Sequence, residues 1–334
     1  MKDRDMVTKE EVKNFFQKNI KPKLVGLEST RKIVLRNLFI FHSIVAFLTF
    51  FVVFLTFFAS KSFPDSERDF FLMIKFILPI GIFIDTLGHK IIVIGYRQQF
   101  KYEVIKELFG VLIKDCIYEP NGVVSSDFFK DSKLVTDDFN KYSGEDFVKG
   151  SIGDIEVEFS EICAIHESKT SEGHTHEGRK DTVFEGLFYV FSLKVDLKQN
   201  TLILNDVAES FFGKIIGRFL QKKTYRPGYQ LVQLESVEFE KKFVVYSDDQ
   251  VKSRVLLKPS VLENLTSFKS KYRESIEVSI RGNKLYIGIE STRNHFEPKL
   301  FGEVVSFHEI REIYDLIQLV RDLQEDLELE SVAA

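Results

Sequence analysis

The stretch "LFIFHSIVAFLTFFVVFLTFFA", from Leu38 to Ala59, contains no Asp, Glu, Lys or Arg in 22 residues. As an α-helix rising about 1.5 Å per residue it would be roughly 33 Å long, enough to cross the hydrocarbon core of a bilayer. A signal peptide is the alternative interpretation. It fits poorly, because the run begins late, is too long and is followed by no small-residue cleavage motif. The stretch therefore predicts a membrane-spanning helix.

A second apolar block, "FFLMIKFILPIGIFIDTLGHKIIVIGY", runs from Phe70 to Tyr96. Coming ten residues after a strong span, it predicts the return helix of a hairpin over residues 37–96. Lys75 is near one end and can extend its ammonium group toward the interface. Pro79 is tolerated as a kink position in a membrane helix.

Asp85 is the exceptional residue of this block. One interpretation makes it an intramembrane polar site, because charged side chains within a span are costly and are kept for function. The other places it close to the cytoplasmic interface, because His89 and Lys90 follow within about one turn. We favour the second interpretation and retain Asp85 as the polar candidate of the hairpin.

The distribution of charge predicts the orientation of the hairpin. Residues 1–36 form a basic arm with ten Lys and Arg against five Asp and Glu, whereas the connecting loop "SKSFPDSERD" holds two basic residues. The positive-inside rule therefore places both termini in the cytoplasm. The isolated Cys116 and Cys163 fit a reducing compartment. Residues 97–334 carry 32 basic against 41 acidic residues, which argues against nucleic acid as a partner.

The remaining sequence predicts a helical stalk and a cytoplasmic α+β domain. Apolar residues recur at helical spacing over 97–114, and "EPNG" then breaks the helix. From 115 to 334 we expect a mainly antiparallel sheet with short helices, since "DIEVEFSEICAI", "TVFEGLFYVFSLKVD" and "TLILNDV" have strand patterns. Further strands are expected around 243–246 and 251–257, a hairpin over "SIEVSIRGNKLYIGIE", and a long amphipathic helix at the C-terminus.

His174 and His176 are the most tempting metal ligands in the sequence. Alternate residues of a strand share a face, so an HxH pair can chelate. A zinc site needs a third and fourth ligand at defined spacing, however, and the segment around this pair is rich in Gly, Ser and Thr. We therefore predict a solvated hairpin tip and no metal.

Asp248 and Asp249 are adjacent carboxylates, a pattern that could serve metal or acid–base chemistry. Neighbouring strand residues point to opposite faces, so turn formation is the better interpretation. The sequence contains no Walker loop, dinucleotide fingerprint, HExxH or nucleophile elbow. We predict no catalytic residues and no cofactor.

The segment "DVAESFFGKIIGRFLQKK", from Asp206 to Lys223, predicts an amphipathic helix. Its apolar stripe could pack on the sheet. Alternatively, the helix could lie at the membrane surface, where basic residues contact anionic headgroups. The candidates for that contact are Lys214, Arg218, Lys222 and Lys223.

Several blocks together resemble an uncharacterised bacterial family: "YSGEDFVKGSIGDIEVEFSE", "RKDTVFEGLFYVF", "AESFFGKIIGRFLQKK" and "LESVEFEKKFVVYSDDQVKSRVLLKPS". Its members are two-span membrane proteins with a cytoplasmic domain of unknown function. The resemblance implies a bacterial inner-membrane protein with a cytoplasmic α+β domain, and it supplies no site residues. The hairpin tip with His174 and His176 departs from the family's basic and polar tips.

We expect a non-enzymatic scaffold or binding protein that holds a β-rich domain near the bilayer. The alternatives are a membrane-anchored hydrolase around Asp248 and Asp249, or a ligand sensor that uses a cleft in the domain. An unidentified protein partner and self-association through the hairpin or the C-terminal helix are also expected. A concave pocket with convergent titratable groups would favour an enzyme, and a flat apolar patch would favour a scaffold.

Overall fold

The computed structural model describes residues 8–61, 67–168, 179–194, 196–205, 228–272, 275–301, 310–311 and 313–322. The chain divides into two compact units. The helical unit comprises residues 14–107 and 297–306. The sheet unit comprises residues 1–13, 108–296 and 307–334.

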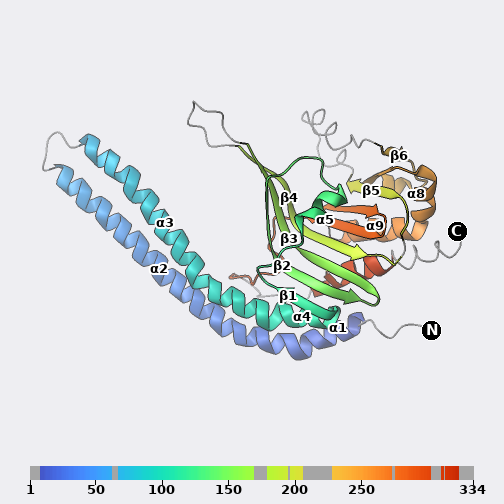
Figure 1. The fold of residues 1–334 in the computed structure, drawn as a ribbon. Coiled ribbons are helices and arrows are strands. Elements are labelled where there is room, and N and C mark those ends of the chain that lie inside the picture. The colour runs from blue at the N-terminus through green and yellow to red at the C-terminus, as the bar shows by residue number, and fades with distance from the viewer. Residues whose placement is uncertain are drawn as a thin grey trace. The chain divides into compact units, whose positions relative to one another are not determined.

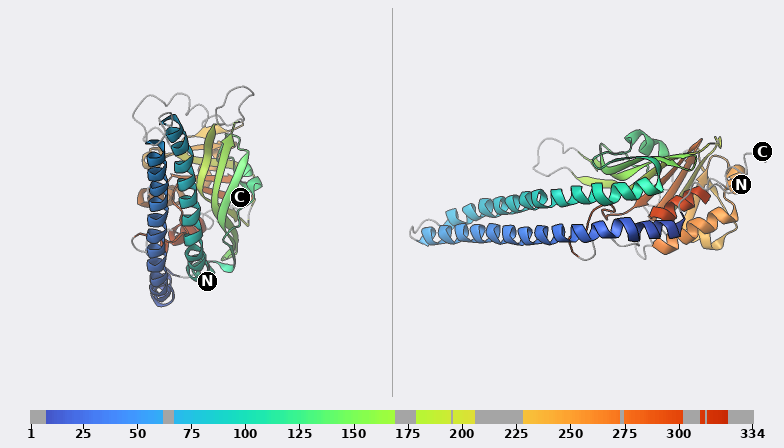
Figure 2. Two further views of the ribbon diagram at one scale, coloured as in Figure 1. Left: turned by 90° about the vertical axis from the view of Figure 1, so that its left-hand side faces the viewer. Right: turned by 90° about the horizontal axis from the view of Figure 1, so that it is seen from below.

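The helical unit is built on two long antiparallel apolar helices, as the sequence predicts (Figure 1). The helices over residues 9–112 are α1 (Lys9–Phe15), the π-helical turn η1 (Phe16–Ile20), α2 (Lys21–Lys61), α3 (Glu67–Phe100), the π-helical turn η2 (Lys101–Ile105) and α4 (Lys106–Leu112), and the unit boundaries fall within α1 and α4. The helix α2 already begins at Lys21, so the second half of the expected basic arm continues the first apolar helix without a break. Figure 2 shows α2 and α3 side by side along their length.

Burial changes along this hairpin. Near its base, Ile20, Leu27, Val34 and Leu38 are buried at spacings typical of a helix–helix seam, and Val93, Tyr96 and Phe100 are buried on α3. Farther along, the apolar side chains are exposed: Phe39 by 74%, Phe47 by 65%, Phe50 by 68% and Phe83 by 66%. The outer half of the hairpin therefore presents apolar surface that the described residues do not cover.

A short segment after the sheet closes the base of the helical unit. Glu297 forms ion pairs with Arg97 at 2.8 Å and with the buried Lys101 at 3.9 Å. The Arg31 guanidinium donates to the carbonyl oxygen of Leu300 at 2.6 Å. These contacts bind residues of the segment to both α2 and α3, as well as to η2.

Within the described residues, the sheet unit contains one nine-stranded sheet whose strand pairs are antiparallel, with the order β1-β2-β3-β4-β9-β8-β5-β7-β6. The strands are β1 (Lys114–Glu119), β2 (Lys141–Ile152), β3 (Ile155–Glu167), β4 (Lys180–Ser192), β5 (Asn200–Asn205), β6 (Gln230–Val232), β7 (Phe243–Ser247), β8 (Ser275–Arg281) and β9 (Lys284–Glu290). The expected β3 alternation is present, with Ile155, Val157 and Phe159 buried. The β8–β9 hairpin turns at Gly282, whose φ of 57° suits glycine.

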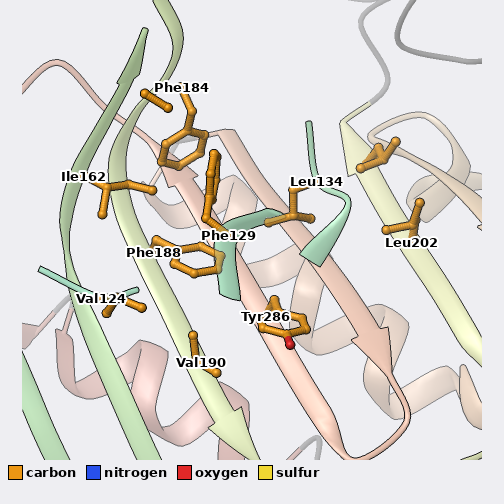
Figure 3. Close-up of a cluster of buried hydrophobic side chains, with 11 residues drawn as sticks. Val124, Phe129, Leu134, Ile162, Phe184, Phe188, Val190, Leu202 and Tyr286 are labelled. Atoms are coloured by element: carbon orange, nitrogen blue, oxygen red, sulfur yellow. The ribbon is translucent and has the colours of Figure 1, made fainter. Parts of the chain in front are cut away.

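The two faces of the sheet have separate cores. On one face, α5 (Ser126–Ser132) inserts Phe129 against Phe184 and Phe188 of β4, with ring centroids 5.2 Å and 5.1 Å away (Figure 3). On the other face, Phe159 of β3 stacks on Tyr189 of β4 at 4.7 Å. Side chains buried on both faces explain why β4 has a continuous apolar run instead of strict alternation.

Further short helices of the sheet unit follow the central strands. They are α7 (Val237–Glu240), α8 (Gln250–Leu256) and α9 (Pro259–Tyr272). Helix α8 replaces the strand expected over 251–257, because Asp249 caps a helix at this point. The helix of the stalk expected over 97–114 ends at Leu112, and β1 begins at Lys114, ahead of the "EPNG" turn.

The predicted C-terminal helix is described only in part. Residues 310–311 and 313–322 are helical, and Ile310, Ile317 and Val320 from its expected apolar face are buried. The rest of the predicted helix lies outside the described residues. The coarser prediction, an antiparallel sheet with short helices, is confirmed.

Candidate functional site

Three polar side chains meet between the two long helices of the hairpin. His42 Nδ1 lies 2.5 Å from Asp85 Oδ1, and His42 Nε2 lies 3.3 Å from His89 Nδ1. The two imidazole rings have centroids 5.5 Å apart. His42 comes from α2, whereas Asp85 and His89 are four residues apart and share one face of α3. We refer to these three residues as the hairpin triad.

Small residues on α3 allow the helices to approach at the triad. A Cβ on Gly88 would lie 2.0 Å from the ring of Phe41, so the phenyl ring occupies the space that a side chain would need. One step along the interface, a Cβ on Gly81 would lie 2.7 Å from the Thr49 hydroxyl oxygen. Glycine at such positions permits close packing of two helices.

The two ring nitrogens of His42 have different partners. Nδ1 faces the Asp85 carboxylate, and Nε2 faces His89. If Nδ1 carries the ring proton, it donates to Asp85 and leaves Nε2 as an acceptor. Asp85, the candidate predicted from sequence, thus contacts His42 of α2 directly. Through His42 it is also linked to His89 of α3. The sequence analysis did not select His42, although it is the one ionisable residue between Asn37 and Ser60.

The sheet unit contains a polar cleft of about 390 Å³. Cys163 and Glu161 of β3 and Glu185 of β4 line it, together with Ser291 and Arg293 after β9. Ile162 and Ala164 pack against α5, so the alternating Glu161 and Cys163 place this cleft on the opposite face of the sheet. Burial, and secondarily the charge of Glu185, raises the pKa of the Cys163 thiol.

A β-bulge beside the cleft brings three carboxylates together. The register of β2 shifts between Glu145 and Val148, and Asp146 adopts a φ of 60°. Carboxylate oxygens of Glu145, Asp146 and Glu161 consequently lie within 4.8 Å of one another. The Tyr118 hydroxyl donates to Asp146, and the backbone N–H of His295 donates to Glu161 at 2.6 Å. These donors give the cluster a structural role in holding β1, β2 and β3 to the loop after β9.

Asp248 and Asp249 act as structural side chains. Asp248 accepts from the backbone and side-chain nitrogens of Asn200 at 2.9 Å and 2.6 Å. Asp249 caps α8 by accepting from the N–H groups of Val251 and Lys252. The Lys252 N–H is the main reason that the pKa of the Asp249 carboxyl is lowered. The two carboxylates bind different partners.

Two sets of candidates lie outside the described residues. One is the histidine pair His174 and His176. The other is the basic set Lys214, Arg218, Lys222 and Lys223. Both remain predictions from the sequence.

Comparison with known proteins supports one part of the expected family resemblance. Residues 182–329 match a family described as "Protein of unknown function (DUF3137)". No curated protein matches the chain. Among solved structures, a crystal structure of the mycobacterial trehalose monomycolate transport factor A, TtfA, aligns with 62% of this chain and 88% of that chain, at 11% identity and a TM-score of 0.32. A TM-score this low does not establish a shared fold, and nothing about function rests on it.

Proposed function

We propose that this chain is a two-span protein of the bacterial inner membrane, with both termini in the cytoplasm. In this proposal the hairpin anchors the sheet unit, which acts as a non-enzymatic scaffold or binding domain near the bilayer. Its expected partners are lipid, including anionic headgroups, an unidentified protein and a second copy of the chain.

The observation that carries the proposal is the exposed apolar surface of α2 and α3. Large side chains are exposed around the outer part of both helices, among them Phe47, Phe50, Phe54, Ile82 and Phe83. Water would make so much exposed apolar surface unfavourable, whereas lipid is its natural solvent. An α-helix also satisfies its own backbone hydrogen bonds, as a span requires.

The positions of the polar side chains of the hairpin also fit a lipid environment. Asp85 and His42 are turned toward each other between the helices instead of standing singly on the apolar surface. Ionisable residues in membrane segments are expected to pair in this way. At the base of the hairpin, Lys23 pairs with Glu107, and Arg31 pairs with Glu28 at 2.7 Å, as suits a region in water.

Extraction from bacterial membranes tests the anchor. The full chain should stay in the membrane pellet in alkaline carbonate and dissolve only in detergent. Replacing Phe47, Phe50 and Phe54 with Lys should release it, because each central Lys costs about 2.5–3.5 kcal/mol on insertion scales. Replacing the same three residues with Leu is the matched control and should leave the chain in the pellet. Release of the wild-type chain by carbonate would contradict the proposal.

The polar cleft favours a ligand sensor as the second candidate. It is concave and lined by several carboxylates and one guanidinium, as a site for a small polar molecule would be. The hydrolase alternative has no comparable support, because Asp248 and Asp249 have capping and turn roles. A thermal-shift screen of small polar compounds on the full chain, repeated with Glu185→Gln, tests the sensor. A stabilising compound that acts equally on both proteins would argue against this cleft.

A further inference from the structure

Two imidazole nitrogens face each other across the helix interface. His42 Nε2 and His89 Nδ1 are 3.3 Å apart. Asp85 lies 2.5 Å from His42 Nδ1, so a ring proton on Nδ1 would leave Nε2 able to act as a ligand. Two ring nitrogens this close share an electropositive atom. It is either a proton carried by His89 or a metal ion bound by both rings.

The arrangement has two features of a metal centre. Histidines that bind metal nearly always donate their other ring N–H to a carboxylate, a backbone carbonyl or water, and Asp85 lies 2.5 Å from the other ring nitrogen of His42. Two nitrogens bound to one tetrahedral zinc ion, each about 2.0–2.1 Å from it, are about 3.3 Å apart. The observed separation of the two nitrogens matches this distance.

The surroundings also suit a divalent cation. A metal ion would neutralise the carboxylate of Asp85, the one acidic residue between Phe70 and Tyr96. The side chains of His42 and Asp85 remain 39% and 36% exposed. Because Asp85 is expected close to the cytoplasmic interface, water there can supply the third and fourth ligands. Imidazole ligands suit zinc, copper and nickel, whereas magnesium and calcium prefer oxygen.

We propose that His42 and His89 bind one divalent transition-metal ion, such as Zn²⁺, and that Asp85 positions the His42 ring. The ion would link α2 to α3 through one ligand from each. The proposal does not depend on the membrane anchor, because the two ligands lie within a single helical hairpin. A membrane-extraction result and a metal-binding result can therefore fail separately.

Metal titration of the full chain in detergent micelles tests the proposal. The reference protein carries His174→Ala and His176→Ala, so that the loop pair cannot contribute. After removal of metal with a chelator, Zn²⁺ binding is measured by competition with a chromophoric chelator, and Co²⁺ binding by its visible absorption. We expect one equivalent of metal in the reference protein, and none after a further His42→Ala or His89→Ala change.

Two more variants separate the roles of the side chains. Asp85→Asn should bind metal about 10–100-fold more weakly, the usual effect of losing the carboxylate behind a ligating histidine. His166→Ala is the control: its ring contacts the carbonyl oxygen of Asp138, and its loss should change nothing. Binding that survives both His42→Ala and His89→Ala would overturn the proposal, and so would a reference protein that binds no metal. The latter result would assign the short contact to a shared proton.

The alanine variants could lose metal binding simply because they misfold, so a variant that gains a spectroscopic signal is also needed. His89→Cys keeps a ligand at this position and should add a thiolate-to-cobalt charge-transfer band in the near ultraviolet. The same change with His42→Ala should weaken or abolish that band. A folded His89→Cys protein that lacks the band in the presence of Co²⁺ would also overturn the proposal.

Discussion

The side chain of Asp249 accepts hydrogen bonds from the backbone N–H groups of Val251 at 3.1 Å and Lys252 at 3.0 Å. These groups belong to the first turn of α8, where N–H groups have no partner within the helix. Replacing Asp249 with Ala should therefore lower the melting temperature of the sheet unit by roughly 2–4 °C. Asp249→Asn keeps an acceptor oxygen and should lose much less. Equal losses in the two variants would show that capping is not the cause.

The same carboxylate predicts a dependence on pH. Hydrogen bonding lowers the folded-state pKa of Asp249, so its ionised form contributes stability above the unfolded-state pKa. That contribution is lost as the pH falls through the lowered pKa of the folded state. Thermal melts of wild type and Asp249→Ala should differ most near neutral pH, and the difference should shrink in acid. A difference that stays constant into strong acid would contradict the assignment.

Single residues also explain two failures of the sequence analysis. Residues 251–257 were predicted to be a strand, because a capping aspartate and a turn aspartate look the same without tertiary context. Asp146 occupies a left-handed conformation that glycine would have signalled but aspartate does not. That bulge is why Glu145 and Asp146, adjacent in sequence, both approach Glu161. Neither local detail could be deduced from composition or periodicity.

Among the elements, the close approach of α2 and α3 depends on Gly88. Gly88→Ala would place a methyl carbon 2.0 Å from the Phe41 ring, so the ring must move. We expect this change to destabilise the hairpin by about 1–3 kcal/mol, as overpacking does elsewhere. Thermal denaturation of the full chain in detergent micelles, followed by circular dichroism, measures the effect.

The same helix offers a matched control for Gly88. A Cβ on Gly95 would meet no atom within 4 Å, so Gly95→Ala should be neutral or slightly stabilising. Combining Gly88→Ala with Phe41→Ala should recover part of the loss, because the smaller side chain vacates the space. If Gly88→Ala and Gly95→Ala behave alike, the packing contact is unimportant.

The basic segment from Asp206 to Lys223 raises a second question at this scale. The chain contains no Trp, so Phe212→Trp adds a single reporter to the full protein. If the segment lies at the membrane surface, brominated anionic lipids in nanodiscs should quench this fluorescence. Changing Lys214, Arg218, Lys222 and Lys223 to Gln should reduce the quenching, since each basic residue contributes about 1 kcal/mol near an anionic surface. Unquenched fluorescence in the parent protein would favour packing on the sheet.

The elements themselves were more predictable than their partners. Long apolar runs identified the two apolar helices, and the strand pattern identified the β8–β9 hairpin, because these features depend on residues close in sequence. Neither signal could place His42 beside Asp85, which is 43 residues away and on another helix. A lone histidine within an apolar run was the available signal. His42 can be matched with Asp85 only when the antiparallel register of α2 and α3 is known.

For the whole molecule, the strand order was beyond the reach of the sequence. β4 pairs with β9 across almost a hundred residues, and β5 lies between β8 and β7. Such pairings are decided by how both faces of the sheet are covered, and no local pattern encodes that choice. The division into an apolar hairpin and an antiparallel sheet domain was predictable, because the composition of a segment indicates whether it prefers apolar or aqueous surroundings.

The orientation of the whole chain in the membrane is the last prediction. Residues 1–36 carry ten basic residues and the loop between α2 and α3 carries two, so the loop is the segment expected to cross the bilayer. An alkaline phosphatase reporter inserted at Asp65 should be active, and one at the C-terminus inactive, whereas a green fluorescent protein at the C-terminus should fluoresce. Exchanging the charge bias, by neutralising Arg31, Lys32 and Arg36 and adding three Lys to the loop, should reduce or invert this pattern. An active phosphatase at the C-terminus of the unaltered chain would place the sheet unit outside the cytoplasm and contradict the proposed orientation.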